Sequence, residues 1–480
     1  MHSRAAVNVG GGVINLGLQL LAVPLAISIS GIDPYGVWVS LFALAQMLVT
    51  VDLGIGAALT RVAGLGMSKE LWRHTNYLFA ILGVAASGVV GAIAAGLSGK
   101  FSHTLSNSGN YVLLALIACI ATFVAFIGRT ASSVCIGWSK FQVDRGLSVL
   151  ASVIRVSILA ICALLGCGIL AVAIADLVFV LVPAILSHAY VRANASRYMS
   201  TYRSGRKELK SLIRTSIPFF ALSMTGTAAL QIQPIIVATF STASQAGIFG
   251  ICFRLLVAGR QALSWVWTPS FTSFVEEIRD RNEISPRIVA KSSVLHVGFV
   301  VAIAIPLGAF SPEILLAWTD VVSRDAEVTL RYIALFLGIM AMYMPSVAVV
   351  NAIGRQAGLA VIQIGWFFTV VIFCSLLTLS IGSIGAGAGL ALATAVAAPF
   401  YVAIGTRIAR YGMYRSAGFI GAVSICFVVW SIIVRQWIVG LADIDCPWGV
   451  LIIEILVYTL PAACIASFQA FRAAKTKDLI

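Results

Sequence analysis

Three arginine residues lie inside long apolar stretches of the chain, where a permanent positive charge is expensive. Arg155 lies in the fifth stretch, and Arg254 and Arg260 share the eighth. Placing an arginine at the centre of a membrane span costs roughly 3 kcal/mol, so such residues usually face a water-filled interior. A guanidinium stays charged and can bind a phosphate through two parallel hydrogen bonds. These residues are therefore our first candidates for binding an anionic headgroup, although Arg155 is also placed to reach back toward the nearer membrane surface.

Amide side chains in the same stretches are suited to hydrogen-bond a neutral part of such a ligand. Asn15 and Gln19 fall on one face of the first stretch, and Gln231 lies in the seventh. Gln261 shares a helical face with Arg254 in the eighth. All four amides are candidate substrate-binding residues. Polar side chains also join neighbouring helices through hydrogen bonds, so helix packing stays open as the alternative.

Two carboxylates inside apolar stretches, Asp52 and Asp176, are candidates for holding a coupling ion. A buried carboxylate favours its protonated form, so it can carry a proton during a transport cycle. Either carboxylate can equally pair with one of the buried arginines. Both roles stay open at this point.

The sequence lacks a recognisable catalytic or cofactor-binding pattern. His296, the one histidine in the middle of a stretch, has no partner at metal-ligand spacing. Gly385, Gly387 and Gly389 resemble a phosphate-binding loop, but no strand precedes them, and close helix packing explains them better. We therefore predict no catalytic residue, no metal, no cofactor and no enzyme activity.

The elements that carry these residues are apolar stretches long enough to cross a bilayer. The chain has 480 residues, of which 60% are hydrophobic and 10% charged, whereas soluble domains are about 25% charged. A membrane span needs about 20 apolar residues. Hydropathy predicts an all-α, polytopic membrane protein with about fourteen spans, near 6–30, 36–58, 76–97, 111–134, 147–166, 168–190, 215–238, 246–269, 291–311, 328–350, 358–381, 383–406, 417–440 and 448–470.

The basic residues gather in every second loop and predict the orientation. With the N-terminus in the cytoplasm, 25 of the 32 lysines and arginines fall on the cytoplasmic side, as expected from the positive-inside rule. The net charge of +14 therefore reflects loop placement and gives no reason to expect a nucleic-acid partner. We predict that both termini are cytoplasmic. The seven basic residues that break the pattern are Lys100, Arg155, Arg254, Arg260, Arg324, Arg331 and Arg435.

The long basic loop near 191–214 divides the chain. We predict a six-helix lobe over residues 1–200, a second over 201–410, and two additional helices with a tail over 411–480. A weak echo crosses the divide, because Tyr35-Gly36 and Ala246-Gly247 each precede a span and each follow a Gln and a Pro. Internal repeats are common in secondary transporters. Two echoes this short can also arise by chance.

Two short motifs near the N-terminus carry a family resemblance. Asp33-Pro34-Tyr35-Gly36-Val37-Trp38 is followed by Asp52-Leu53-Gly54-Ile55-Gly56. This pairing resembles the polysaccharide transporter family, the Wzx-like O-antigen flippases, within the multidrug/oligosaccharidyl-lipid/polysaccharide exporter superfamily. Ala246-Gly247-Ile248-Phe249 and the later Trp267-Thr268-Pro269-Ser270-Phe271 look like the corresponding part of the second half.

The resemblance implies a fold and a function. It implies two six-helix lobes around a central cavity, with the two additional C-terminal helices outside. It also implies that the protein flips an undecaprenyl-diphosphate-linked oligosaccharide, an O-antigen or exopolysaccharide repeat unit, across the bacterial inner membrane by alternating access. The expected partners are the lipid-linked oligosaccharide, the bilayer, and the polysaccharide polymerase and chain-length machinery.

Two other functions are weighed against the flippase. A cation-coupled multidrug antiporter of the same superfamily should favour carboxylates over arginines in its cavity, and this chain shows the opposite balance. A membrane-embedded polymerase or glycosyltransferase should carry a large external loop or an acidic metal site, and the sequence offers neither.

Overall fold

A computed structural model describes residues 2–50, 54–105, 108–199, 216, 226–281, 284–321, 323–409, 413–415 and 417–422. Within these ranges the secondary structure is helical and contains no strand, so the predicted all-α fold is confirmed. The chain forms two compact units, Met1–Gly250 and Ile251–Ile480. The predicted division at residues 200 and 410 stays a prediction.

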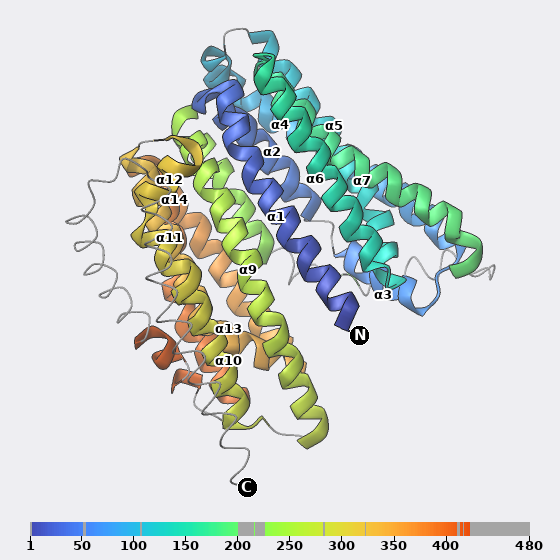
Figure 1. Ribbon diagram of the computed structural model, residues 1–480, viewed down its shortest axis with the longest axis vertical. Coiled ribbons are helices and arrows are strands. Elements are labelled where there is room, and N and C mark those ends of the chain that lie inside the picture. Colours follow the sequence, from blue (N-terminus) through green and yellow to red (C-terminus); the bar gives the residue numbers. More distant parts are fainter. Residues whose placement is uncertain are drawn as a thin grey trace. The chain divides into compact units, whose positions relative to one another are not determined.

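The first unit is a bundle of long helices (Figure 1). Helix α5 packs against α4 and α7, and α6 packs against α1 and α7. The α2 helix lies against α1, α4, α5 and α7. The helices of this unit are α1 His2–Ser30, α2 Ile32–Thr50, α3 Ile55–Leu65, α4 Lys69–Phe101, α5 Ser108–Gly137, α6 Phe141–Leu164, α7 Ile169–Tyr198 and a short helix Gly226–Phe240.

The second unit is built mainly on two long helices. Helix α13 packs along α14 and is contacted by α10, α11 and α12. Helix α9 begins within the first unit and continues into the second. The helices are α9 Ala243–Arg281, α10 Pro286–Phe299, α11 Ile305–Ala309, α12 Ser311–Thr319, α13 Arg324–Ile353 and α14 Gln356–Ala409. A π-helical turn, Val300–Ala304, joins α10 to α11.

Ten described helices are long and apolar enough to cross a membrane. Two boundaries between closely spaced predicted spans, at residues 166–168 and 381–383, are both present. Helices α6 and α7 are separate, and α14 breaks at Ile381 and Gly382, where Gly382 has φ 60° and ψ −136°. Counting the two halves of α14 and the short helix Gly226–Phe240, the described helices match the first twelve predicted spans. Span 417–440 is described only to residue 422, and span 448–470 lies outside the described residues.

The predicted second span, 36–58, is wrong in its second half. Helix α2 ends at Thr50, and α3 begins at Ile55 after Gly54, whose φ of 70° is left-handed. Hydropathy continues through this point because Gly54 is flanked by apolar residues. The left-handed conformation of Gly54, which glycine adopts without steric cost, interrupts the helical backbone directly before α3.

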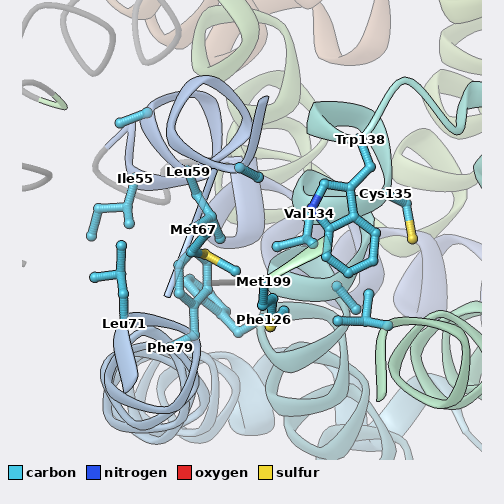
Figure 2. Close-up of a cluster of buried hydrophobic side chains, with 14 of the residues drawn as sticks. Ile55, Leu59, Met67, Leu71, Phe79, Phe126, Val134, Cys135, Trp138 and Met199 are labelled. Carbon is cyan, nitrogen blue, oxygen red and sulfur yellow. The ribbon is translucent and has the colours of Figure 1, made fainter. Parts of the chain in front are cut away.

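One apolar cluster fixes α3 against α4, α5 and α7 (Figure 2). Leu59 and Met67 from the α3 region meet Phe79 of α4 and Phe126 of α5, and all four are buried. Trp138, after the end of α5, closes the cluster and stacks on Tyr198 with ring centroids 4.9 Å apart. These contacts anchor a helix too short to span a membrane by itself.

Gly385, Gly387 and Gly389 allow close helix packing, as predicted. Gly385 and Gly389 face the first half of α14, and Gly387 faces α13. A Cβ atom on Gly389 would lie 2.6 Å from the Cys374 backbone nitrogen.

We expect Gly389→Ala to lower the free energy of unfolding by about 1–3 kcal/mol, because the added methyl group would force the two halves of α14 apart. Gly365→Ala is the matched control in the same helix, since its Cβ would meet nothing within 4 Å. Denaturant unfolding in mixed micelles should distinguish them; equal stabilities would contradict the packing.

Candidate functional site

A buried ion pair lies in the first unit. The Arg155 Nε atom of α6 is 2.5 Å from the Asp176 Oδ1 atom of α7, and both side chains are less than a tenth exposed. Trp38 of α2 donates an indole N–H to Asp176 Oδ2 at 2.7 Å. The Arg155 guanidinium also lies over the Phe179 ring, 5.5 Å from its centroid. Three helices therefore meet at one carboxylate.

The sequence left open whether Asp176 pairs with a buried arginine, and the structure shows that its carboxylate pairs with Arg155. A buried carboxylate is tolerated when an opposite charge and hydrogen bonds replace the water it has lost. The same pairing balances the charge of Arg155, which reduces its suitability as a free anion-binding group. A role for Asp176 in coupling stays a prediction.

Trp38 is a site residue that sequence reasoning did not single out. It stands inside the N-terminal motif, and its ring is 1% exposed. A buried indole N–H usually needs an acceptor, so an intramembrane tryptophan among polar helices is a usable signal. The sequence does not indicate which carboxylate accepts the hydrogen bond from this indole N–H.

A second polar contact joins α1 to α6 in the same unit. Ser152 Oγ donates to Asn15 Oδ1 at 2.5 Å. Gln19 lies half-buried one turn further along α1. The contact brings the predicted polar face of α1 onto the face of α6 that carries Arg155. It also gives Asn15 a packing role alongside its predicted substrate contact.

The other two intramembrane arginines lie on α9 in the second unit. Arg254 is half-buried and forms no ion pair among the described residues. The Arg260 Nε atom is buried and has no hydrogen-bond partner in the described part of the chain. Gln261 Nε2 donates to Ser264 Oγ at 3.2 Å. Two positive charges on one helix are therefore without an acidic partner among the residues described.

Aromatic residues and a close helix contact hold Arg260 in place. The Tyr343 side chain of α13 lies near the Arg260 guanidinium. Tyr343 stacks on Tyr401 of α14 with ring centroids 4.6 Å apart. One residue before the arginine, a Cβ on Gly259 would lie 2.5 Å from Leu337 Cδ1, so α9 approaches α13 closely there. The arginine is thus positioned by three packed helices.

The remaining predicted residues are placed less completely. Gln231 is half-buried in the helix Gly226–Phe240, and no described contact joins it to the other candidates. Asp52 lies outside the described residues. No group of three or more histidines, cysteines, aspartates or glutamates in the described ranges is arranged to hold a metal ion.

A polar cluster that joins α4, α5 and α7 was not predicted from the sequence. Asn76 Oδ1 accepts from Thr130 Oγ1 at 2.9 Å and lies 3.1 Å from His188 Nε2. The other ring nitrogen of His188 lies 2.9 Å from the Ala184 carbonyl oxygen. The three side chains are far apart in the sequence and none of them stands out by spacing. Their convergence depends on how the three helices pack.

Residues 4–275 match a sequence model of the polysaccharide biosynthesis protein family. The chain belongs to this family. The family assignment confirms the resemblance drawn from the N-terminal motifs. A search of curated proteins found no match.

This polysaccharide biosynthesis family member has the fold of known transporters. It resembles the lipid II flippase MurJ in an inward closed conformation, with 12% identity and a TM-score of 0.71 over 98% of this chain and 99% of the other. It resembles an inward-facing MATE family multidrug resistance transporter of the MOP superfamily, with 16% identity and a TM-score of 0.60 over 86% of this chain and 98% of the other.

A third solved structure is a MOP superfamily transporter from Pyrococcus furiosus, described by the reverse polarity of its binding pocket. It is 17% identical, with a TM-score of 0.52 over 87% of this chain and 95% of the other. At these identities the likenesses establish a shared fold and leave the substrate open. The family member is accordingly a multi-pass membrane protein with a transporter fold.

Proposed function

We propose that the protein is a flippase for an undecaprenyl-diphosphate-linked oligosaccharide. It would move an O-antigen or exopolysaccharide repeat unit from the inner to the outer leaflet of the bacterial inner membrane. Membership of the polysaccharide biosynthesis family, together with the transporter fold, supports this activity. The observation that carries the proposal is the pair of α9 arginines, of which Arg260 has a buried Nε atom with no hydrogen-bond partner among the described residues.

Arg254 and Arg260 would hold the diphosphate. A diphosphate offers several oxygen acceptors to guanidinium donors, and such charged hydrogen bonds are stronger in a site that excludes bulk water. Two neighbouring features would restrict the conformations of the Arg260 side chain. They are the packing of Gly259 on Leu337 and the stacked rings of Tyr343 and Tyr401. Gln261, next to Arg260 on α9, would meet the sugar or the linkage. Asn15, Gln19 and Gln231 remain predicted substrate-binding residues.

Transport would proceed by alternating access. The sugar would enter a polar interior while the lipid chain stays in the bilayer, and the protein would then expose the sugar on the other side. The Arg155–Asp176 pair would serve either as a fixed brace or as the place where a coupling proton is exchanged. Both termini would lie in the cytoplasm, on the side where the lipid-linked unit is made. The flipped unit would reach the polymerase and chain-length machinery from the outer leaflet.

A multidrug antiporter is the second candidate, favoured by the fold shared with the MATE transporter. A site for cationic drugs would be expected to present carboxylates. The predicted span 246–269, which lies within α9, instead carries Arg254 and Arg260 and no carboxylate.

Deletion of the gene tests the proposed activity in cells. Without the flippase, we expect the complete repeat unit to accumulate on its lipid carrier at the cytoplasmic face, because synthesis continues while translocation stops. Lipid extraction and analysis of the linked glycan measure this accumulation. Unchanged lipid-linked and surface glycans together with drug hypersensitivity would favour the antiporter and refute the flippase.

A further inference from the structure

Lys100 is one of the seven basic residues that break the charge pattern, and its contacts give it a specific position. It lies at the end of α4, exposed to solvent. Its Nζ atom donates to the Ala238 carbonyl oxygen at 2.9 Å and to the Thr239 carbonyl oxygen at 2.8 Å. These are among the last carbonyls of the helix Gly226–Phe240. The lysine therefore joins two helices that are far apart in the sequence.

The chemistry of this contact is that of a reversible cap. The last four carbonyls of a helix have no partner within the helix, and the helix end carries a partial negative charge. An ammonium group satisfies both, and its flexible stem can release them to water at little cost when the surface is exposed. The contact is thus strong enough to bias a conformation and weak enough to open.

A close backbone contact lies within the same unit, at the neighbouring helix ends. A Cβ atom on Gly36, near the start of α2, would lie 2.1 Å from the Ala243 carbonyl oxygen and 2.5 Å from the Gly247 nitrogen, near the start of α9. A Cβ atom on Gly247 would lie 2.4 Å from the Ile32 carbonyl oxygen. The two dipeptides that echo each other in the sequence, Tyr35-Gly36 and Ala246-Gly247, therefore meet.

These contacts lie at helix ends that the charge pattern places on the outer side of the membrane. Helix Gly226–Phe240 ends two residues before α9 begins, so Lys100 and Gly36 hold the two arms of one hairpin. Lys100 binds the arm that ends, and Gly36 contacts the arm that begins. An opening that moved this hairpin away from α2 and α4 would break both contacts.

We propose that Lys100 is a gating residue, a latch that holds the outer end of the first unit closed. The latch rests on the proposed transport function, in which this end must open for the substrate to leave. It acts through the position of the hairpin 226–250 and touches no substrate. Removing the ammonium group should shift the protein toward the open arrangement while the rest of the fold stays intact.

Thiol labelling tests the latch without any substrate. Ala246, which is 1% exposed, is replaced by cysteine in a chain whose nine native cysteines have been removed. The purified protein in nanodiscs is treated with a water-soluble maleimide, and the labelling rate is measured. We expect Lys100→Met to raise the rate about tenfold, since hydrogen bonds to a charged donor are lost. Lys100→Arg should keep the slow rate, because it can still donate to both carbonyls.

Lys69→Met is the matched control, since Lys69 is exposed at the opposite end of α4. Equal labelling rates for the wild type, Lys100→Met and Lys69→Met would overturn the latch. If Lys100→Met does not fold, Lys100→Gln replaces it, and Val39→Cys, 4% exposed, offers a second reporter. Because labelling needs no substrate, a failed latch leaves the flippase standing. A failed transport assay with faster Lys100→Met labelling would refute the flippase alone.

Discussion

Replacing Arg260 by alanine is expected to reduce transport of the lipid-linked oligosaccharide by about tenfold to a hundredfold. A hydrogen bond to a charged group contributes about 1.5–3 kcal/mol, and each 1.4 kcal/mol corresponds to a factor of ten. Arg254→Ala should act in the same direction with a smaller effect, because Arg254 is placed less deeply. The rate of translocation in reconstituted vesicles, at matched protein content, measures both changes.

Two further variants separate a specific role from a general effect of charge. Arg260→Lys should retain part of the activity, because it keeps the charge but loses the two parallel donors. Arg331→Ala is the matched control, since Arg331 is 45% exposed and pairs with Glu327 in the same helix. Its transport should equal the wild type. Full activity of both Arg254→Ala and Arg260→Ala would exclude them as the diphosphate clamp.

The second large effect is expected at the buried ion pair. Arg155→Met should lower the free energy of unfolding by about 3–5 kcal/mol, because it leaves the Asp176 carboxylate buried without its counter-charge. Asp176→Asn should be destabilising for the converse reason. The double variant should recover most of the loss, since neither buried charge remains. Denaturant unfolding in mixed micelles gives the three values.

The same three variants separate the two proposed roles of Asp176. If the pair is a brace, transport by the double variant should recover along with its stability. If Asp176 exchanges a coupling proton, transport should stay low although the stability returns. Losses that simply add in the double variant would contradict the ion pair itself, because contacting charges must couple.

Most of the fold could be predicted from the sequence, because lipid imposes one rule on every span. Backbone groups in hydrocarbon must be bonded within a helix, so apolar length alone locates helices such as α4 and α5. The rule fails where the backbone changes conformation inside an apolar stretch. Left-handed Gly54 interrupts one such stretch directly before α3, and Val300–Ala304 widens into a π-helical turn without any change in hydropathy.

The sequence predicts which residues belong to the candidate site better than it predicts which of them contact one another. Depth in the membrane singled out Arg155 and Asp176, but only the packing of α6 on α7 shows that they form an ion pair. Trp38 and His188 were passed over because a single polar ring in an apolar helix has no spacing pattern. Their hydrogen-bond partners lie on other helices, and hydropathy does not predict the order of helices around a bundle.

The most direct test of the central claim is translocation by the purified protein. Vesicles are loaded with an undecaprenyl-diphosphate-linked oligosaccharide in both leaflets, and an impermeant glycosidase is added outside. A flippase should make nearly all of the sugar accessible over time, and Arg260→Ala should slow this sharply. If the inner half of the sugar stays protected, as in vesicles without protein, the protein does not flip this class of lipid and the account is wrong.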